Sequence, residues 1–348
     1  MTRKPSGELR RGWTTGACAT AATKAALIRL WRGAFPSDVQ IVLPRGEKPV
    51  FPLALSECGA DWARVGITKD AGDDPDVTHG ALIVVTVRPG GNGIKFTAGT
   101  GVGVVTKPGL PIPVGEAAIN PIPRQMMSAV VNEMAAKYAR PADVEIEVSI
   151  PDGEVIAQKT WNPRLGIKGG LSILGTTGVV RPFSCAAWIA SIHRGVDVAR
   201  ADQLRHVAGC TGATSERAVQ QHFDLPDHAM LDMGDFAGGL LKYIKKNPVE
   251  RVTIGGGIGK MAKLAQGAVD LHSSRSQVDF TKLAALVGDT RVKEANTALE
   301  AYEIVGAELA NRIAIAARVQ AQALVGLQTQ IDTIVIDRAG NIIAKAQS

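Results

Sequence analysis

The hydrophobic pattern at the start of the chain predicts one long helix followed by short strands. An Ala-rich run begins after Thr14 and Thr15, which suit a helix start, and ends at about Trp31, before Gly33 and Pro36. Short apolar runs then predict strands at residues 39–43, 50–55, 62–68, 81–87, 94–96 and 102–106.

A second helix and a hairpin complete the first part of the chain. Residues 124–138 place apolar side chains on one helical face, and residues 144–150 alternate as a strand. We expect residues 155–161 to pair with that strand through a turn at Asp152 and Gly153. These elements predict an N-terminal α+β domain.

After residue 165 the pattern changes to short apolar strands that alternate with helices. Strands are predicted at residues 171–174, 204–208, 229–232, 251–254, 333–336 and 342–344. Helices are predicted near 185–194 and 260–268, and two more over 280–326. One further helix is predicted to begin at Ser215, and another, after the strand at 229–232, to end at about residue 246. This alternation is typical of a doubly wound parallel sheet. We therefore predict a flexible arm over residues 1–11, an α+β domain over 12–165 and a Rossmann-like α/β domain over 166–348.

Composition narrows the class of protein. The 348 residues are 45% hydrophobic and 21% charged, as in soluble globular proteins. The net charge of +6 comes from scattered Lys and Arg, so nucleic acid is not indicated. We expect no signal peptide and no membrane span, because no apolar run approaches the required length. The four cysteines lack metal-ligand spacing, which predicts reduced thiols, no metal site and a cytoplasmic location.

Residues 69–80 are the most polar segment of the chain. They combine four carboxylates with Lys69, Thr78 and His79, and Gly and Pro interrupt them too often for a helix or a central strand. Carboxylates this close repel one another unless a cation, a proton or a hydrogen-bonding ligand relieves them. A solvated acidic turn and a functional loop between two strands are both compatible with the pattern.

Two glycine-rich turns, at residues 171–182 and 252–263, each follow a predicted strand. Ligands of open α/β sheets bind beyond the carboxyl ends of strands, where helix N-termini favour negative charge. The second turn lacks the P-loop pattern, and Lys260 stands where a dinucleotide fingerprint needs its third glycine. Gly255, Gly257 and Gly259 retain the looser spacing of many S-adenosylmethionine (AdoMet) sites, although a tight strand-to-helix turn explains them equally well.

Several collinear motifs together resemble one family. The motifs are WTTGACATAATKAA at 13–26, KDAGDDPDVTHG at 69–80, GVGVVTKPGL at 101–110, INPIPR at 119–124, GGLSILGTTG at 169–178 and GGIGKMAKLA at 256–265. They are similar to the cobalt-precorrin-5B C-1 methyltransferases, over about residues 10–345. The segment GCTGATSER at 209–217 departs from the family pattern.

The resemblance implies AdoMet-dependent methylation of cobalt-precorrin-5B at C-1, giving cobalt-precorrin-6A in oxygen-independent cobalamin biosynthesis. AdoMet is then the cosubstrate, and cobalt enters only as part of an anionic corrin substrate. The implied arrangement places substrate-binding motifs in residues 12–165 and AdoMet in residues 166–348.

The assignment of roles is our hypothesis. The candidate catalytic residues are His79 and Asp73 first, then Asp70 and Asp74. The candidate AdoMet-binding residues are Gly255, Gly257, Gly259, Lys260, Gly175, Thr176, Thr177 and Gly178. The candidate substrate-binding residues are Thr14, Thr15, Lys69, Lys107, Arg124 and Arg181. Helix capping explains the threonines equally well. The lysines and arginines are equally compatible with ordinary surface cations.

Two other classes stay open. An NAD-dependent oxidoreductase would use the 252–263 turn, although its missing third glycine counts against it. A non-catalytic carrier of corrin intermediates would bind the substrate without converting it. The apolar helices at 280–326 fit either the core or a homodimer interface.

Overall fold

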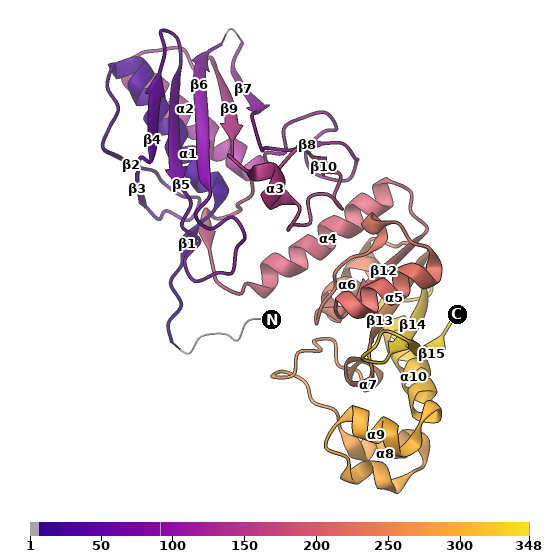
Figure 1. Cartoon of the computed structure of the whole chain (residues 1–348). Coiled ribbons are helices and arrows are strands. Elements are labelled where there is room, and N and C mark those ends of the chain that lie inside the picture. Colours follow the sequence, from indigo (N-terminus) through magenta and orange to yellow (C-terminus); the bar gives the residue numbers. More distant parts are fainter. Residues whose placement is uncertain (1–6, 91, 348) are drawn as a thin grey trace. The chain divides into compact units, whose positions relative to one another are not determined.

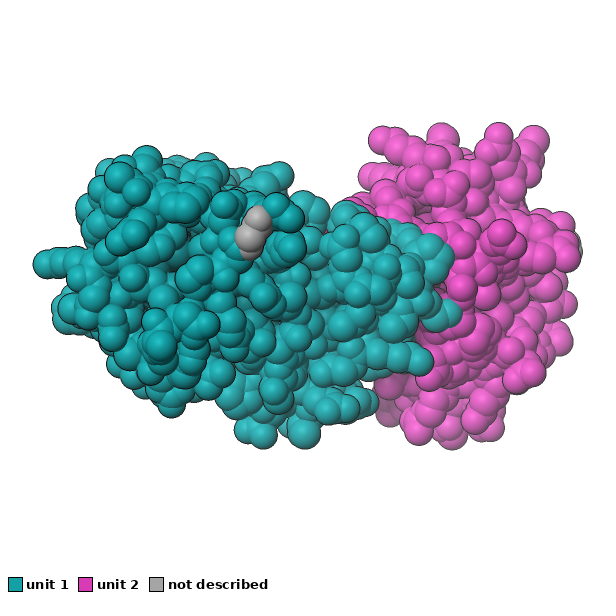
Figure 2. Space-filling view, turned by 90° about the horizontal axis from the view of Figure 1, so that it is seen from above, with its two compact units in different colours: residues 1–184 teal, residues 185–348 magenta. Residues whose placement is uncertain are grey.

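The computed structural model describes residues 7–90 and 92–347, and the chain forms two compact units. Unit 1 is Met1–Ser184 and unit 2 is Cys185–Ser348 (Figure 2). The division falls after the predicted boundary at residue 165, because residues that follow this boundary pair with strands of unit 1. Among the described residues, no helix combines the length and the apolar character that a membrane crossing requires.

Unit 1 is built on a five-stranded mixed sheet with two helices on one face (Figure 1). The strand order is β4 (Leu55–Cys58), β5 (Ala63–Thr68), β6 (Leu82–Pro89), β9 (Val144–Ser149) and β7 (Ile94–Ala98). Helix α1 (Thr15–Arg32) packs against β5 and β6, and α2 (Pro121–Tyr138) lies beside α1. Half of the buried positions of α1 are alanine, which lets its backbone approach the sheet and α2 closely.

Local sequence determines where α1 begins and ends. Thr14 is the N-cap, and its hydroxyl accepts a hydrogen bond from the Ala17 N–H at 3.2 Å. Gly33 ends the helix in the left-handed region, with φ 92°. The helix predicted from the Ala-rich run is therefore confirmed.

Small two-stranded sheets hold the connections of unit 1. They pair β1 (Gly12–Trp13) with β11 (Val179–Val180), β2 (Asp38–Gln40) with β3 (Val50–Pro52), and β8 (Val104–Val105) with β10 (Ile167–Lys168). The predicted hairpin at Asp152 and Gly153 is wrong, because helix α3 (Gly153–Ala157) follows β9 instead. Strand β9 already has β6 and β7 as neighbours, so it has no free edge for another strand.

Unit 2 contains a four-stranded sheet with helices on both faces (Figure 1). Its order is β12 (His206–Cys210), β13 (Arg251–Gly257), β14 (Gln330–Ile336) and β15 (Ile342–Ala346). The first three strands are parallel and β15 is antiparallel. Helix α5 (Ala213–Phe223) covers one face. The core on the other face includes α4 (Cys185–Ala201), α6 (Ala237–Lys246), α7 (Ile258–Ala265) and α10 (Ala307–Val325).

Alternation along the strands separates the two cores of unit 2. Ala208 and Ile334 pack with Val219 of α5. Val207 and Val335, one residue away in each strand, belong to the larger core on the opposite face. Both faces of the sheet are thus buried, and the chain as a whole has a mixed α/β fold.

Two predicted segments of unit 2 differ from the structure. Residues 229–232 do not form a strand; a 3-10 turn, η1 (Asp227–Ala229), is followed by a single bridge between Met230 and Ala208. Residues 280–326 form more than two helices, because Gly288 and Gly306 interrupt them. The described elements there are α8 (Phe280–Val287), η2 (Thr290–Glu294), α9 (Ala298–Val305) and α10.

Candidate functional site

The acidic segment 69–80 is held by the residues that precede α1. The Arg10 guanidinium binds both carboxylate oxygens of Asp70, and the Arg10 N–H donates to Asp73 Oδ2 at 2.6 Å. Gly12 and Gly72 permit this close approach, since a Cβ on Gly12 would lie 2.0 Å from the Ala71 carbonyl carbon. The prediction of a flexible arm over residues 1–11 therefore needs correction for Arg10 and Arg11, while residues 1–6 lie outside the described part.

Internal partners neutralise the other carboxylates of the segment. The ammonium of Lys69 is buried and donates to Asp76 at 2.6 Å and to Thr78. Asp74 Oδ1 accepts the Phe183 N–H at 2.8 Å. The repulsion expected among these carboxylates is thus relieved by two cations and by backbone N–H groups.

These contacts shift the pKa values of the carboxylates in opposite directions. Hydrogen bonds from Arg10 and the Gly72 N–H hold the pKa of Asp70 below its usual value. Burial would raise the pKa of Asp76, but the charge and hydrogen bond of Lys69, with the bonds from Thr78, bring it below the usual value. Burial raises the pKa of Asp74. Asp74 therefore holds a proton more readily than the other two.

His79 is the candidate whose geometry best suits proton transfer. Its Nδ1 accepts a hydrogen bond from the Ala71 N–H at 3.1 Å, and its side chain is 52% exposed. Nδ1 is thereby committed to the loop, and no described residue occupies Nε2. Because Nδ1 accepts a hydrogen bond, the neutral imidazole carries its hydrogen on Nε2, where it can act only as a donor toward a bound group.

The glycine turn at 175–178 lies at the N-terminus of α1, in unit 1. The Gly16 N–H donates to the Leu174 carbonyl at 2.9 Å, and the Thr14 N–H donates to Gly178 at 3.0 Å. A Cβ on Gly175 would lie 2.4 Å from Thr14 Oγ1. Contacts within unit 1 therefore already account for the glycines in this turn.

Two expectations change with this placement. Residues 171–174 are not a strand of the parallel sheet of unit 2, since Leu171 and Ile173 form single bridges within unit 1. The helix start is also less suited to an anion than predicted, because Gly16 and Ala17 donate their N–H groups internally. Thr14 acts as a cap, and Thr15 is buried.

The predicted substrate cations have different environments. Arg124 is committed to unit 1, because Nε donates to the Ile119 carbonyl at 2.8 Å and Nη1 lies 2.8 Å from Glu116. Its Nη2 donates to a third partner, the Ala117 carbonyl, at 3.0 Å. Together with the burial of Lys69, this argues against direct substrate contacts by these two residues.

The remaining predicted contacts of unit 1 differ in accessibility. Lys107 is half-buried beside Gly166. Arg181 and Thr176 are exposed, and Thr177 bonds within its own turn. Arg181 follows β11 directly and is the most accessible of the predicted substrate cations.

In unit 2, a second candidate site lies at the carboxyl ends of β12 and β13. Cys210 and Gly255 are paired across these parallel strands. From there the chain turns to opposite faces of the sheet, since β12 leads to α5 and β13 leads to α7. Neighbouring strands whose connections diverge in this way leave a crevice where open α/β sheets bind ligands.

A glycine precedes each of the two helices that follow this strand edge. Gly212 is the N-cap of α5 and Gly257 the N-cap of α7, and neither helix has a side-chain cap. No atom lies within 4 Å of the position that a Cβ would occupy on either residue. Neither residue has a positive φ that would require glycine, so close approach of a ligand remains a reason for the missing side chains.

Packing within unit 2 explains two of the other glycines in the 252–263 segment but not the third. A Cβ on Gly255 would lie 2.6 Å from Val219 of α5, and one on Gly256 would lie 2.8 Å from Thr211 Oγ1. Gly259 has only Ala298 in its vicinity, at 3.8 Å. Of the predicted AdoMet contacts, Gly257 therefore faces open space and Gly255 is needed for helix packing. Gly259 lies at ordinary van der Waals distance from Ala298.

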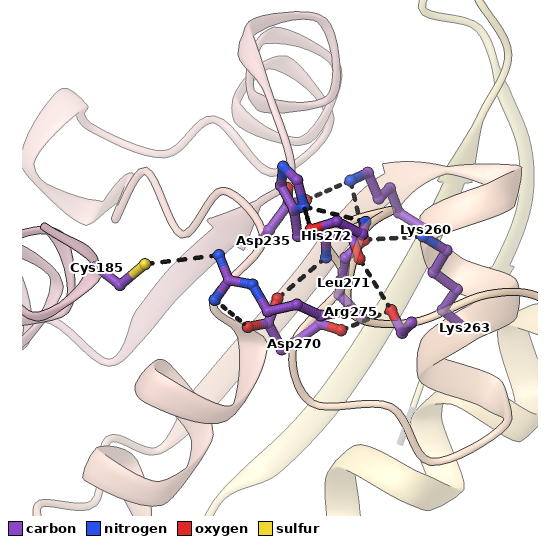
Figure 3. Close-up of polar contacts among 10 residues, drawn as sticks. Cys185, Asp235, Lys260, Lys263, Asp270, Leu271, His272 and Arg275 are labelled. Carbon is purple, nitrogen blue, oxygen red and sulfur yellow. Dashed lines mark hydrogen bonds and ion pairs between the residues drawn. The ribbon is translucent and has the colours of Figure 1, made fainter. Parts of the chain in front are cut away.

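The side chain of Lys260 is 33% exposed, and its ammonium joins a polar cluster (Figure 3). Its Nζ donates to Asp235 Oδ1 at 2.5 Å and to the Leu271 carbonyl at 3.0 Å. Lys263 donates to the same carbonyl at 3.1 Å, and burial, then the nearby charge of Lys260, lowers the pKa of Lys263.

Sequence reasoning missed three parts of these sites: Arg10, Asp235 and the β12–α5 turn at Thr211 and Gly212. The last had a detectable signal, since an apolar run, a glycine and a helix follow one another there as they do at 252–263. Arg10 and Asp235 had none, because their partners are distant in sequence. Across residues 7–90 and 92–347, no three His, Cys, Asp or Glu side chains are grouped to hold a metal ion.

The fold and these sites define a two-unit α/β protein with a polar loop in one unit and a ligand-type strand edge in the other. The family model CbiD matches residues 2–182, and the model of the CbiD C-terminal domain matches residues 270–347. The chain therefore belongs to the CbiD family.

Curated relatives extend over nearly the whole chain. The cobalt-precorrin-5B C(1)-methyltransferases of Brucella anthropi and Brucella canis are each 58% identical to it over 97% of this chain and 96% of the relative. A crystal structure of the cobalamin biosynthesis protein CbiD from Archaeoglobus fulgidus is 27% identical over 83% of each chain, with a TM-score of 0.42.

Proposed function

We propose that the protein transfers a methyl group from AdoMet to C-1 of cobalt-precorrin-5B, giving cobalt-precorrin-6A in oxygen-independent cobalamin biosynthesis. The observation that carries this proposal is the 58% identity to curated methyltransferases over nearly the full length. The cobalt is part of the anionic corrin substrate. We infer a cytoplasmic enzyme, since Cys18, Cys58 and Cys185 are free cysteines, as is typical of that compartment.

AdoMet is proposed to bind unit 2 at the carboxyl ends of β12 and β13. The fit rests on the open space beside Gly257 and Gly212 and on two helix N-termini without side-chain caps. We describe this unit as Rossmann-like on the basis of its parallel strands and its diverging connections. When bound, AdoMet would supply an activated methyl group, and the residues of the protein would bind and orient it.

The residues of unit 1 are proposed to bind the corrin and to move a proton. His79 is the first candidate, because its Nε2–H can donate to the substrate while Nδ1 accepts the Ala71 N–H. Asp74 is the second, since burial raises its pKa. Asp70 and Asp73 hold Arg10 and are better suited to shaping the loop. Arg181 and Thr176 are the exposed groups proposed to contact the substrate.

A homodimer is proposed as the oligomeric state. Ile315 and Val319 on α10 are 50% and 53% exposed, and Leu327 just beyond the helix is 97% exposed. Such an apolar stripe is typical of a contact surface. Analytical ultracentrifugation of the full chain checks this, and a monomer at micromolar concentration would contradict it.

Calorimetric titration with S-adenosylhomocysteine, beside NAD, is the first test of the proposed function. Micromolar binding of S-adenosylhomocysteine, together with methylation of cobalt-precorrin-5B detected by mass spectrometry, supports the proposal. Binding of NAD alone would favour an oxidoreductase. Corrin binding without methylation in the presence of AdoMet would favour a carrier.

A further inference from the structure

The Asp235–Lys260 ion pair connects segments that surround the proposed AdoMet crevice. Lys260 lies in the first turn of α7, three residues after Gly257, whose Cβ position has no atom within 4 Å. Asp235 lies in the segment that runs beside β12, where the Gly234 N–H donates to the Cys210 carbonyl at 2.9 Å. The pair thus joins the turn after β13 to the segment beside β12.

A lysine at this position is unfavourable for the helix alone. The N-terminus of a helix carries partial positive charge, so a cation in its first turn is repelled. The Asp235 side chain is only 6% exposed, and its charge requires a partner. Each residue therefore offsets an electrostatic cost of the other, which makes the pair a rigid link.

A third segment strengthens this link (Figure 3). The Leu271 carbonyl accepts bonds from Lys260 and Lys263, while the Leu271 N–H donates to the Asp235 carbonyl at 2.8 Å. The loop that follows α7 is thereby tied to both partners of the ion pair. With Nζ bound to Asp235 and Leu271, the ammonium of Lys260 already has two protein partners.

We propose that Lys260 and Asp235 are positioning residues that hold the turn at residues 257–259 in the geometry that binds AdoMet. This inference rests on the proposed function of unit 2. It replaces the predicted direct contact between Lys260 and AdoMet by an indirect role. Loss of the pair should weaken AdoMet binding and leave the rate at saturating AdoMet nearly unchanged, because neither residue touches the reacting atoms.

The test measures S-adenosylhomocysteine affinity by calorimetry, and KM for AdoMet and kcat with cobalt-precorrin-5B. We expect Lys260→Met and Asp235→Asn each to weaken binding at least tenfold and to raise KM for AdoMet, with kcat within threefold of wild type. Lys260→Arg, which keeps the charge-assisted bond, should remain within threefold of wild type in affinity. Lys282→Met is the matched control, since Lys282 is 70% exposed and lies 3.9 Å from its aspartate.

The Asp235→Asn variant separates positioning from direct contact. If Lys260 contacted AdoMet directly, removal of the Asp235 charge would leave or improve affinity, and that result would overturn the inference. The double variant Asp235→Asn/Lys260→Met removes the unpaired buried charge, so its melting temperature should recover while its affinity stays low. Recovery of affinity together with stability would reduce the pair to a folding role and refute positioning.

Ligand binding by the wild-type protein distinguishes failure of the positioning role from failure of the proposed methyltransferase function. Binding by wild type and unchanged binding by Lys260→Met refutes positioning but leaves the methyltransferase proposal intact. A wild-type protein that binds neither AdoMet nor S-adenosylhomocysteine, with or without corrin, refutes both.

Discussion

The Nδ1 atom of His79 accepts a hydrogen bond from the backbone N–H of Ala71 at 3.1 Å. This bond fixes the imidazole against its own loop and favours the tautomer that carries its proton on Nε2. The structural and the chemical role of His79 are thus assigned to different ring nitrogens, and substitutions can separate them.

His79→Asn should lower kcat at least about 100-fold, the usual contribution of a general acid or base. The Asn side-chain oxygen can replace Nδ1 as acceptor from Ala71, so the loop stays folded while the Nε2–H donor is lost. Single-turnover methylation assays measure the effect, with the exposed His222→Ala as control. Wild-type kcat in His79→Asn would exclude the proton-transfer role.

Gly257→Val should abolish binding of S-adenosylhomocysteine without changing the melting temperature by more than about 2 °C. A Cβ at this position meets no atom within 4 Å, and the side chain enters the space proposed for the ligand. Gly255→Val is the matched comparison. Its Cβ would lie 2.6 Å from Val219, so this variant should unfold at a clearly lower temperature. Retained binding in Gly257→Val would move the ligand site elsewhere.

Lys69→Met should destabilise unit 1 by about 3 kcal/mol, because it leaves Asp76 charged, largely buried and without its cation. Chemical denaturation followed by circular dichroism measures this change. Adding Asp76→Asn should recover much of the loss. By contrast, Arg312→Ala removes an exposed pair and should cost less than about 0.5 kcal/mol. If Lys69→Met and Arg312→Ala lowered the free energy of unfolding equally, this result would contradict a buried role for Lys69.

Acidification should destabilise unit 2 in a window set by His206. Burial, and then the charge of Arg251, lowers the pKa of His206 from 6.5 to about 4. Between these values the unfolded chain binds the proton and the folded chain does not, so stability rises with pH in this range and is lost as the pH falls. Melting temperatures from pH 7 to pH 4 should fall less steeply in His206→Gln than in wild type. If the melting temperatures of the two proteins fell equally with pH, His206 would not be the group that controls stability in this range.

Local patterns were sufficient wherever the physics is local. Thr14 and Gly33 delimit α1 through a hydroxyl cap and a left-handed glycine, both of which depend on neighbours in sequence. Alternation of apolar residues was likewise enough to predict β9. The junction between β13 and α7 was also predicted, although Gly255 and Gly256 continue the strand instead of forming a turn. The family resemblance, carried by contiguous motifs, also needed no structure.

Pairing between strands that are distant in sequence decided the parts of the fold that local patterns did not predict. Val179 and Val180 pair with β1 near the other end of unit 1, which moves the turn at 175–178 out of the sheet where we had placed it. Strand β9 has two neighbours, so its predicted hairpin partner forms a helix instead. Sequence patterns do not reveal such choices, because each depends on which edges and faces remain free after the rest of the chain has folded.

The same reason explains which atoms of the candidate residues already have partners within the protein. The polarity of residues 69–80 is visible in the sequence, but the partners that neutralise it are not. Lys69 and Arg124 are cations in conspicuous motifs, yet the fold buries one against Asp76 and binds the other to backbone carbonyls. Residue type determines what a side chain is able to do, and tertiary contacts determine which of its atoms remain available to a ligand.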